Sequence, residues 1–260
     1  QLSATSSAGL PVTFTSSNSA IAAISGSTIT IKDVGAVEIT ATQPGNLNFP
    51  AATPVTRTLV ITKAPVAITA DNKSKTYGSD NPSLTLSYSG FRIGENATVI
   101  NTLPQVITSA ISASDVGTYD IVPSGGDDDH YRFTYTNGTL TINKAVLTAT
   151  ADSKIRVYGT VNPVLTISYS GFKLSDTPSV IDTKPVAATT AVTTSDVGYY
   201  PITLSGGTDN NYTINLVSGT MTVNMANLTV TANNLSKTYF DSNPALTLKY
   251  AGFRNTDNAS

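Results

Sequence analysis

The sequence has no cysteine and no tryptophan, and His130 is its only histidine. The lack of cysteine excludes disulfides, thiolate metal sites and cysteine nucleophiles. One histidine supplies neither a zinc cluster nor a serine–histidine–aspartate triad, so His130 is expected to be a surface turn residue. We therefore expect that the protein is not an enzyme and binds no cofactor, and we assign no catalytic or cofactor-binding residues.

Charged residues are scarce as well, at 12% of the 260 residues, with a net charge of −2. An average soluble domain has about 25%. The 15 basic residues do not cluster, which argues against a nucleic-acid partner. There is no run of about 18 apolar residues, so no membrane insertion is expected. Threonine and serine, with 42 and 28 residues, supply the polar surface instead.

What the sequence does contain is an 81-residue internal repeat. Tyr77-Gly78 recurs as Tyr158-Gly159 and, with one change, as Tyr239-Phe240. Self-similarity at a fixed period is typical of a tandem array. We predict that residues 65–145 and 146–226 are two complete copies.

The two ends of the sequence are predicted to be partial modules. Residues 227–260 correspond to the start of a truncated third copy. Residues 1–64 form a different but related module, because their closing segment Thr58–Ala64 matches Thr139–Ala145. This module is predicted to lack its first strand.

Alternating apolar and polar residues predict β-strands throughout. Tyr131–Thr136 and Thr139–Asn143 both alternate, and Asn137-Gly138 separates them. This arrangement predicts a hairpin with a type I′ turn, and Ser218-Gly219 predicts the same in the second copy. The other expected elements are four strands and two single helical turns: Val66–Ala70, Leu84–Tyr88, Val106–Ile111, Tyr119–Pro123, Glu95–Ile100 and Asp176–Ile181.

One pattern resembles the tyrosine corner of immunoglobulin-like sandwiches. In that corner a tyrosine hydroxyl bonds the backbone of the preceding loop, two residues before a buried core position. Tyr119 and Ile121 fit these two positions, Tyr200 and Ile202 repeat them, and Val37 replaces the tyrosine in the first module. The predicted fold is therefore all-β, with tandem Ig-like β-sandwich modules arranged end to end. A β-grasp-like fold with one short helix is the alternative for the 81-residue units.

An end-to-end arrangement predicts an elongated particle. Gly/Ser-rich sequences make flexible linkers, but Thr139–Ala145 runs directly into the next predicted strand without such a spacer. Modules with strands along the long axis at about 3.3 Å per residue would stack to about 120 Å. Small-angle scattering should then give a radius of gyration of roughly 35 Å, whereas a compact globule of this length gives about 18 Å. A value near the globular one would contradict the arrangement.

The only dense acidic run is Asp127-Asp128-Asp129. Loop carboxylates are Ca²⁺ ligands, so these three residues are the weak candidates for a metal site. The matching loop of the second copy keeps only Asp209, flanked by Thr208 and Asn210, whereas a site built into the repeat would recur. The sequence therefore favours a solvated turn and no metal.

Other recurring residues have structural interpretations. Asp71 and Asp152 align with Asn233, which carries no acid, so we place them at strand ends and not in acid–base catalysis. Lys73 and Lys75 leave open a covalent Lys–Asn crosslink of the kind found in some surface adhesins. The recurring aromatic residues are expected to pack in the core or at module interfaces, with a sugar-stacking platform as the alternative: Tyr77, Tyr88, Phe91, Tyr119 and Tyr131.

The 81-residue unit resembles the MBG domain of bacterial surface proteins. Residues 1–64, through Gly9–Asn18, resemble bacterial Ig-like repeats. The combination is similar to the giant repetitive adhesins of gliding bacteria. The match to the MBG domain rests on these positions: Lys75, Tyr77, Gly78, Asn81, Pro82, Leu84, Tyr88, Gly90, Phe91, Asp115, Gly117, Tyr119, Gly125, Tyr131, Gly138 and Ile142.

This resemblance implies a repetitive stalk segment of a large extracellular adhesin at the cell surface. It implies export by the type IX secretion system and contact with the cell-surface motility or secretion machinery. Through the full-length protein, the partners would be solid surfaces or extracellular polysaccharide. The alternatives are a glycan- or Ca-binding module, or accessory repeats of a secreted enzyme. Phe240, in place of the usual glycine, departs from the family pattern and puts the local turn in doubt.

Overall fold

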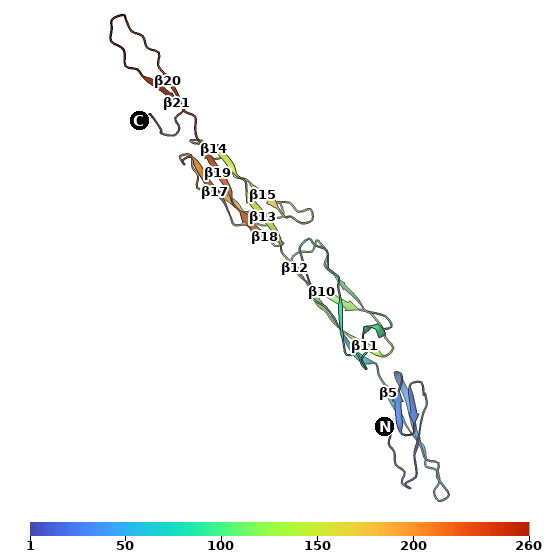
Figure 1. Ribbon diagram of the computed structural model, residues 1–260. Helices are drawn as coiled ribbons and strands as arrows, with labels where there is room; N and C mark the ends of the chain where they lie inside the picture. The colour runs from blue at the N-terminus through green and yellow to red at the C-terminus, as the bar shows by residue number, and fades with distance from the viewer. Residues whose placement is uncertain (260) are drawn as a thin grey trace. The chain divides into compact units, whose positions relative to one another are not determined.

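The computed structural model describes residues 1–259, and these residues form strands joined by turns and loops (Figure 1). Their one helical element is a single 3₁₀ turn, η1 (Ala97–Val99), inside the predicted turn Glu95–Ile100. The counterpart Asp176–Ile181 forms turns only. The all-β prediction is confirmed, and the β-grasp alternative is not favoured. Within the described residues, no helix is long and apolar enough to cross a membrane.

Residue contacts divide the chain into two compact units, which are described separately. The division passes through the first 81-residue copy, so the predicted module boundaries stay predictions. The second copy lies wholly in one unit and shows the fold best. The first unit consists of Gln1–Lys73, Pro82–Ser109 and Thr118–Leu140, and the second of Ser74–Asn81, Ala110–Gly117 and the chain from Thr141 onward.

Two sheets make up the second copy, in the strand orders β15-β13-β18 and β14-β19-β17-β16. Strand β13 contacts β17 and β19 of the other sheet, which places the core between the sheets. Leu147, Ile202 and Met221 are fully buried there. The strands are β13 (Ala145–Ala151), β14 (Lys154–Val157), β15 (Ile167–Ser170), β16 (Val186–Thr189), β17 (Gly198–Ser205), β18 (Tyr212–Val217) and β19 (Gly219–Asn224).

The first copy has the same element order and the same sheet orders, β11-β6-β8 and β7-β12-β10-β9. Each strand predicted from alternation is present; Tyr131–Thr136 has the predicted bounds, and the others are shifted at one or both ends. Strand β7, which has only four residues, was not predicted. The strands are β6 (Ala64–Ala70), β7 (Lys73–Thr76), β8 (Leu86–Ser89), β9 (Gln105–Thr108), β10 (Gly117–Ser124), β11 (Tyr131–Thr136) and β12 (Gly138–Asn143).

The predicted hairpins at Asn137-Gly138 and Ser218-Gly219 are wrong. Strand β11 pairs in parallel with β6, and β12 belongs to the other sheet. In the second copy, β18 pairs in parallel with β13, whereas β19 pairs with β14 and β17. The chain therefore passes from one sheet to the other at each of these dipeptides.

Close backbone approach explains these two glycines. A type I′ turn requires positive φ at both central residues, but neither Gly138 nor Gly219 has a positive φ. A Cβ atom at Gly138 would lie 2.3 Å from the carbonyl oxygen of Ala70, and one at Gly219 would lie 2.2 Å from that of Ala151. Glycine is thus required where the chain crosses between the sheets and passes the last residue of β6 in the first copy or of β13 in the second.

The predicted tyrosine corner is confirmed in the second copy. The hydroxyl of Tyr200 donates to the carbonyl oxygen of Asp196 at 3.0 Å, and Ile202 has no exposed surface. In the first copy Ile121 is likewise fully buried, and Tyr119 is half-buried at the matching position.

Changing Tyr200 to phenylalanine should lower stability modestly. The change keeps the half-buried ring and removes one hydrogen bond, which contributes about 0.5–1.5 kcal/mol. Urea unfolding of the chain and the variant checks this value. Tyr199→Phe is the matched control, because Tyr199 is 81% exposed. Equal stability of the Tyr200 variant and the wild type would show that the corner hydrogen bond adds nothing to the free energy of unfolding.

The first module consists of a three-stranded sheet in the order β1-β4-β5 and the hairpin β2-β3. Ala22, Val37 and Ile39 form its buried centre. Val37, which replaces the corner tyrosine, is 2% exposed and fills the core without a polar group. The strands are β1 (Thr13–Ser16), β2 (Ala22–Ser25), β3 (Thr28–Ile31), β4 (Gly35–Thr42) and β5 (Val55–Ile61).

The third copy contributes one antiparallel pair, β20 (Thr229–Ala232) with β21 (Leu248–Ala251). This pair corresponds to β13 and β15 of the second copy, and all its residues are exposed. Phe240 adopts a positive φ of 76°, close to the 79° of Gly78 and the 78° of Gly159. The turn placed in doubt by the sequence therefore keeps its backbone conformation.

Candidate functional site: the junctions between modules

The acidic run splits into one buried and two exposed side chains. Asp128 is 2% exposed, whereas Asp127 and Asp129 lie on the surface. One carboxylate oxygen of Asp128 accepts hydrogen bonds from the backbone N–H groups of His130 and Tyr131, at 2.8 and 2.9 Å. The expected solvated turn thus applies to the two outer residues but not to Asp128. Among residues 1–259, no three acidic or histidine side chains are grouped to hold a metal ion.

The second copy repeats this arrangement at Asp209. Its side chain is 7% exposed and accepts from the N–H groups of Asn211 and Tyr212, at 2.7 and 2.8 Å. Aspartates commonly fix turns through such bonds to the following backbone. The role retained by both copies is therefore to shape the loop before β11 and β18.

His130 lies on the surface, as predicted. Its Nε2 atom is 3.2 Å from a carboxylate oxygen of Asp33 in the first module, and both side chains are more than half exposed. Exposed ion pairs contribute about 0–1 kcal/mol. The contact is therefore a minor part of the junction between residues 1–64 and the first copy.

Asp71 and Asp152 follow the ends of β6 and β13, so their predicted strand-end position is confirmed. The carboxylate of Asp152 accepts hydrogen bonds from the hydroxyls of Ser168, at 2.6 Å, and Thr166. Asp71 has the same two bonds, from Ser87 and Thr85. These bonds satisfy the carboxylates locally.

The destabilisation caused by Asp152→Asn is expected to fade in acid. Hydrogen bonds from Ser168 and Thr166 lower the pKa of Asp152. The carboxylate therefore adds stability above its unfolded pKa of about 3.9, and this stability is lost as the pH falls through the lower folded pKa. Urea unfolding of wild type and variant between about pH 6 and pH 2 checks this window. A difference that persists unchanged at the acid end would contradict the assignment.

Lys75 is a buried cation bound by carbonyl oxygens. Its Nζ atom donates to the carbonyl oxygens of Ile111 at 2.6 Å and Ser79 at 3.1 Å. Arg156 takes its place in the second copy and donates to the carbonyl oxygens of Val192 and Thr160. An arginine cannot form a Lys–Asn amide, so the feature common to both copies is a cation that joins two loops. A crosslink at Lys75 would show as the loss of one ammonia in the intact mass.

The recurring aromatic residues pack as expected. Tyr77, Tyr131 and Tyr212 are 7%, 5% and 2% exposed. The rings of Tyr131 and Phe91 form an edge-to-face pair with centroids 5.2 Å apart, and those of Tyr212 and Phe172 form one with centroids 5.7 Å apart. Edge-to-face pairs add about 0.5–1.5 kcal/mol to the burial of the rings. These residues are therefore not part of an exposed sugar-stacking platform.

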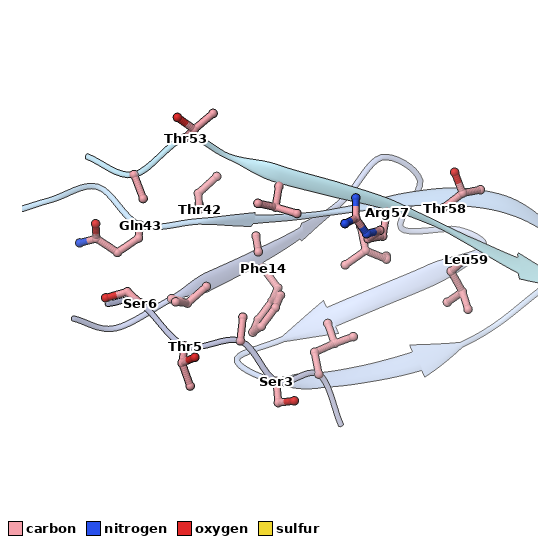
Figure 2. A pocket seen from close by; sticks show the side chains of 17 residues that line it. Ser3, Thr5, Ser6, Phe14, Thr42, Gln43, Thr53, Arg57, Thr58 and Leu59 are labelled. Carbon is pink, nitrogen blue, oxygen red and sulfur yellow. The ribbon is translucent and has the colours of Figure 1, made fainter. Parts of the chain in front are cut away.

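A groove of about 490 Å³ lies in the first module, lined by the N-terminal segment, β4 and β5. Figure 2 shows the ring of Phe14 between the segment that carries Ser3 and Thr5 and the strands that carry Thr42 and Arg57. Phe14 is the one aromatic residue and Arg57 the one charged residue among those lining it. Most of the exposed lining of the groove is apolar, and no sequence pattern predicted the groove.

The junctions themselves are built from direct side-chain contacts. Lys63 lies in the two-residue connection between β5 and β6, and its Nζ atom donates to the carbonyl oxygen of Asp128 at 2.6 Å. Lys144 is the single residue between β12 and β13, and it donates to the carbonyl oxygen of Asp209 at 2.7 Å. The buried aspartate loop of each copy therefore receives the lysine that precedes that copy.

Within the second compact unit, Tyr77 of the first copy also contacts an aromatic ring of the second copy. The rings of Tyr77 and Tyr212 form an edge-to-face pair with centroids 5.5 Å apart. Both hydroxyls donate to the same carboxylate oxygen of Asp176, at 3.2 and 2.7 Å. Burial, followed by the hydrogen bond to Asp176, raises the pKa of both tyrosines above the ordinary value. The tyrosines therefore stay neutral donors.

A second polar contact lies beside these rings. The side-chain oxygen of Asn211 accepts from the backbone N–H of Val116 at 2.9 Å, and its amide nitrogen donates to Asp115 at 2.8 Å. Both partners belong to the loop that precedes the corner strand of the first copy. One asparagine thus uses both ends of its amide across the junction.

No local sequence pattern predicts these contacts, because the partners are about 65 to 99 positions apart. A signal for the lysine contact was present. Lys63 recurs as Lys144, and Asp128 recurs as Asp209, each at the repeat period. Two residues that both recur at the repeat period, such as this lysine and this aspartate, are candidates for a contact between copies.

Comparison with known protein families finds a family whose model matches three segments of the chain. Residues 66–141, 147–222 and 228–260 each match the MBG domain (YGX type). The three matches together span most of the chain and follow the 81-residue period. A comparison with curated proteins finds no match.

Proposed function

Because the chain belongs to the MBG domain family of the YGX type, with three matches in tandem, we propose that it is a repetitive stalk segment of a large bacterial adhesin. The adhesin is exported and displayed outside the cell, at its surface, as part of a gliding-motility type filament. The segment has a mechanical role, and its modules catalyse no reaction.

The observation that carries this proposal is the construction of the junctions. Strands β12 and β13 are separated by one residue, Lys144, whose side chain donates to the carbonyl oxygen of Asp209 in the loop before β18. Flexible connections are Gly/Ser-rich and unbound. The connection is this short and carries lysine, tyrosine and asparagine contacts, so no flexible spacer separates the two copies. Direct attachment of one module to the next is what a stalk needs in order to hold a distant tip away from the cell.

The partners follow from this role. A stalk places a terminal binding region against solid surfaces or extracellular polysaccharide, and its other end meets the motility or secretion machinery of the cell surface. The hydroxyl-rich, weakly charged composition supports this role, since 12% charged residues leave little electrostatic attraction to unrelated molecules.

Surface display is tested by antibodies raised against residues 66–141. We expect them to label intact cells of the source bacterium without permeabilisation, and protease added outside the cells should remove the signal. A cytoplasmic marker, which must stay unlabelled until the cells are permeabilised, is the control. Labelling only after permeabilisation would overturn the proposed location.

Direct ligand binding by the modules is the competing function, and the apolar groove beside Phe14 is the observation that favours it. A glycan array probed with the labelled chain separates the two functions. The stalk proposal expects no specific binding. Binding that is lost in Phe14→Ala and kept in Phe49→Ala, where the ring lies outside the groove, would favour the competing function.

A further inference from the structure

One contact between successive copies occurs twice in the chain. The hydroxyl of Tyr77 donates to the carboxylate of Asp176 at 3.2 Å. The hydroxyl of Tyr158 donates to that of Asp257 at 3.4 Å. Both pairs are 99 positions apart, and both lie within the second compact unit. Each copy therefore presents its tyrosine to an aspartate of the copy that follows.

The glycine after each tyrosine leaves space for the same following copy. A Cβ atom at Gly78 would lie 2.4 Å from the Cβ of Lys173, and one at Gly159 would lie 2.4 Å from the Cβ of Arg254. Real Cβ atoms do not approach this closely. In both cases the contacted residue is basic and stands three positions before the aspartate.

The contacted segment is a turn with a fixed backbone shape. Leu174 and Asn255, which follow the basic residues, have positive φ values of 54° and 51°. Ile93 has the same conformation in the first copy, at 55°. Leu174 is 53% exposed, and the turn that carries it contacts Tyr77 and Gly78 of the preceding copy.

We propose that the Tyr-Gly pair is a docking surface whose occupant is the next copy of the repeat. It takes a turn made of a lysine or arginine, a residue with positive φ, and an aspartate three positions after the basic residue. The tyrosine hydroxyl selects the aspartate, and the missing side chain of the glycine admits the stem of the basic residue.

Phe240 shows how this surface is closed. Its φ of 76° keeps the turn of Gly78 and Gly159, so only the space is lost. A Cβ atom at the matching Gly78 or Gly159 would clash with the basic residue of the following copy, so a phenylalanine side chain at position 240 leaves no space for such a residue. Both Tyr239 and Phe240 are exposed. The Tyr239-Phe240 surface therefore does not receive a turn of this kind.

The purpose of this docking surface rests on the proposed stalk function, but the surface itself is inferred from contacts within the chain. Because the chain has no cysteine, two spin labels can be placed at Ser74→Cys and Ile155→Cys, exposed positions one period apart that both lie in the second compact unit. Pulsed electron spin resonance then measures the distribution of distances between the first and second copies. We expect a narrow distribution that Gly78→Phe, the residue of the third copy, converts into a broad one.

Gly94→Phe is the matched control, since Gly94 has a φ of 75° and a Cβ atom added there would have no other atom within 4 Å. It carries the same backbone strain without the clash and should leave the distribution narrow. In a second pair, Gly78→Ala should broaden the distribution, and adding Lys173→Gly should restore it. The proposal is overturned if Gly78→Phe stays narrow, if Gly94→Phe broadens equally, or if the rescue fails. Each result leaves the surface-display test unaffected.

Discussion

Replacing Tyr212 with alanine should leave the second copy close to unfolding. Tyr212 is 2% exposed, and its ring forms edge-to-face pairs with Phe172 and Tyr77. Its hydroxyl accepts from the backbone N–H of Lys173 at 2.8 Å and donates to Asp176 at 2.7 Å. Large-to-small aromatic core substitutions cost about 3–5 kcal/mol, a large part of the total stability of about 5–15 kcal/mol of a domain. Urea unfolding followed by tyrosine fluorescence measures the loss.

Two further variants separate the ring from the hydroxyl. Tyr212→Phe keeps the ring, so its cost should be limited to the lost hydrogen bonds, at about 0.5–1.5 kcal/mol each. Tyr199→Ala removes a ring that is 81% exposed and should change stability by no more than about 0.5 kcal/mol. If Tyr212→Ala and Tyr212→Phe lost the same stability, the hydroxyl network and not the packed ring would support the copy.

Gly219→Ala should be destabilising although its backbone suits any residue. Gly219 has no positive φ, so alanine brings no conformational strain. Its Cβ atom would instead lie 2.2 Å from the carbonyl oxygen of Ala151, in a strand that is buried between neighbours. Overpacking of a well-packed site costs about 1–3 kcal/mol and sometimes more. Because the clash is with a rigid backbone oxygen, the cost of Gly219→Ala should lie at the upper end of this range. Thermal unfolding of the variant checks this.

Two further variants, Gly206→Ala and Gly219→Asn, distinguish a steric requirement for glycine at position 219 from a requirement for a left-handed turn. Gly206 has a φ of 70° and open space around it, so Gly206→Ala should cost only the left-handed strain of about 1–2 kcal/mol. Asparagine tolerates a left-handed turn, yet Gly219→Asn should be as harmful as Gly219→Ala. A well-tolerated asparagine would support the turn explanation and contradict the steric one.

The sequence by itself determined the features that arise from neighbouring residues and from recurrence. The 81-residue period established the tandem array, because each copy repeats its own core and turn residues. Alternation located the long strands, because period two is the geometry of a strand with one buried face. Tyr200 and Ile202 could be assigned for the same reason, since the corner bond of Tyr200 reaches only four residues back.

Tertiary structure alone decided which strand edges meet and which side chains cross a junction. Alternation is the same for a hairpin partner and for a strand of the facing sheet, so the separation of β11 from β12 was not visible. Gly138 fits a turn by its residue type, and only the nearby carbonyl of Ala70 shows that close approach requires it. Asp128 is acidic and would be assigned to the surface by composition, but backbone N–H groups satisfy it in the interior. The contact of Tyr77 with Asp176 depends on packing between residues 99 positions apart, which no local pattern specifies.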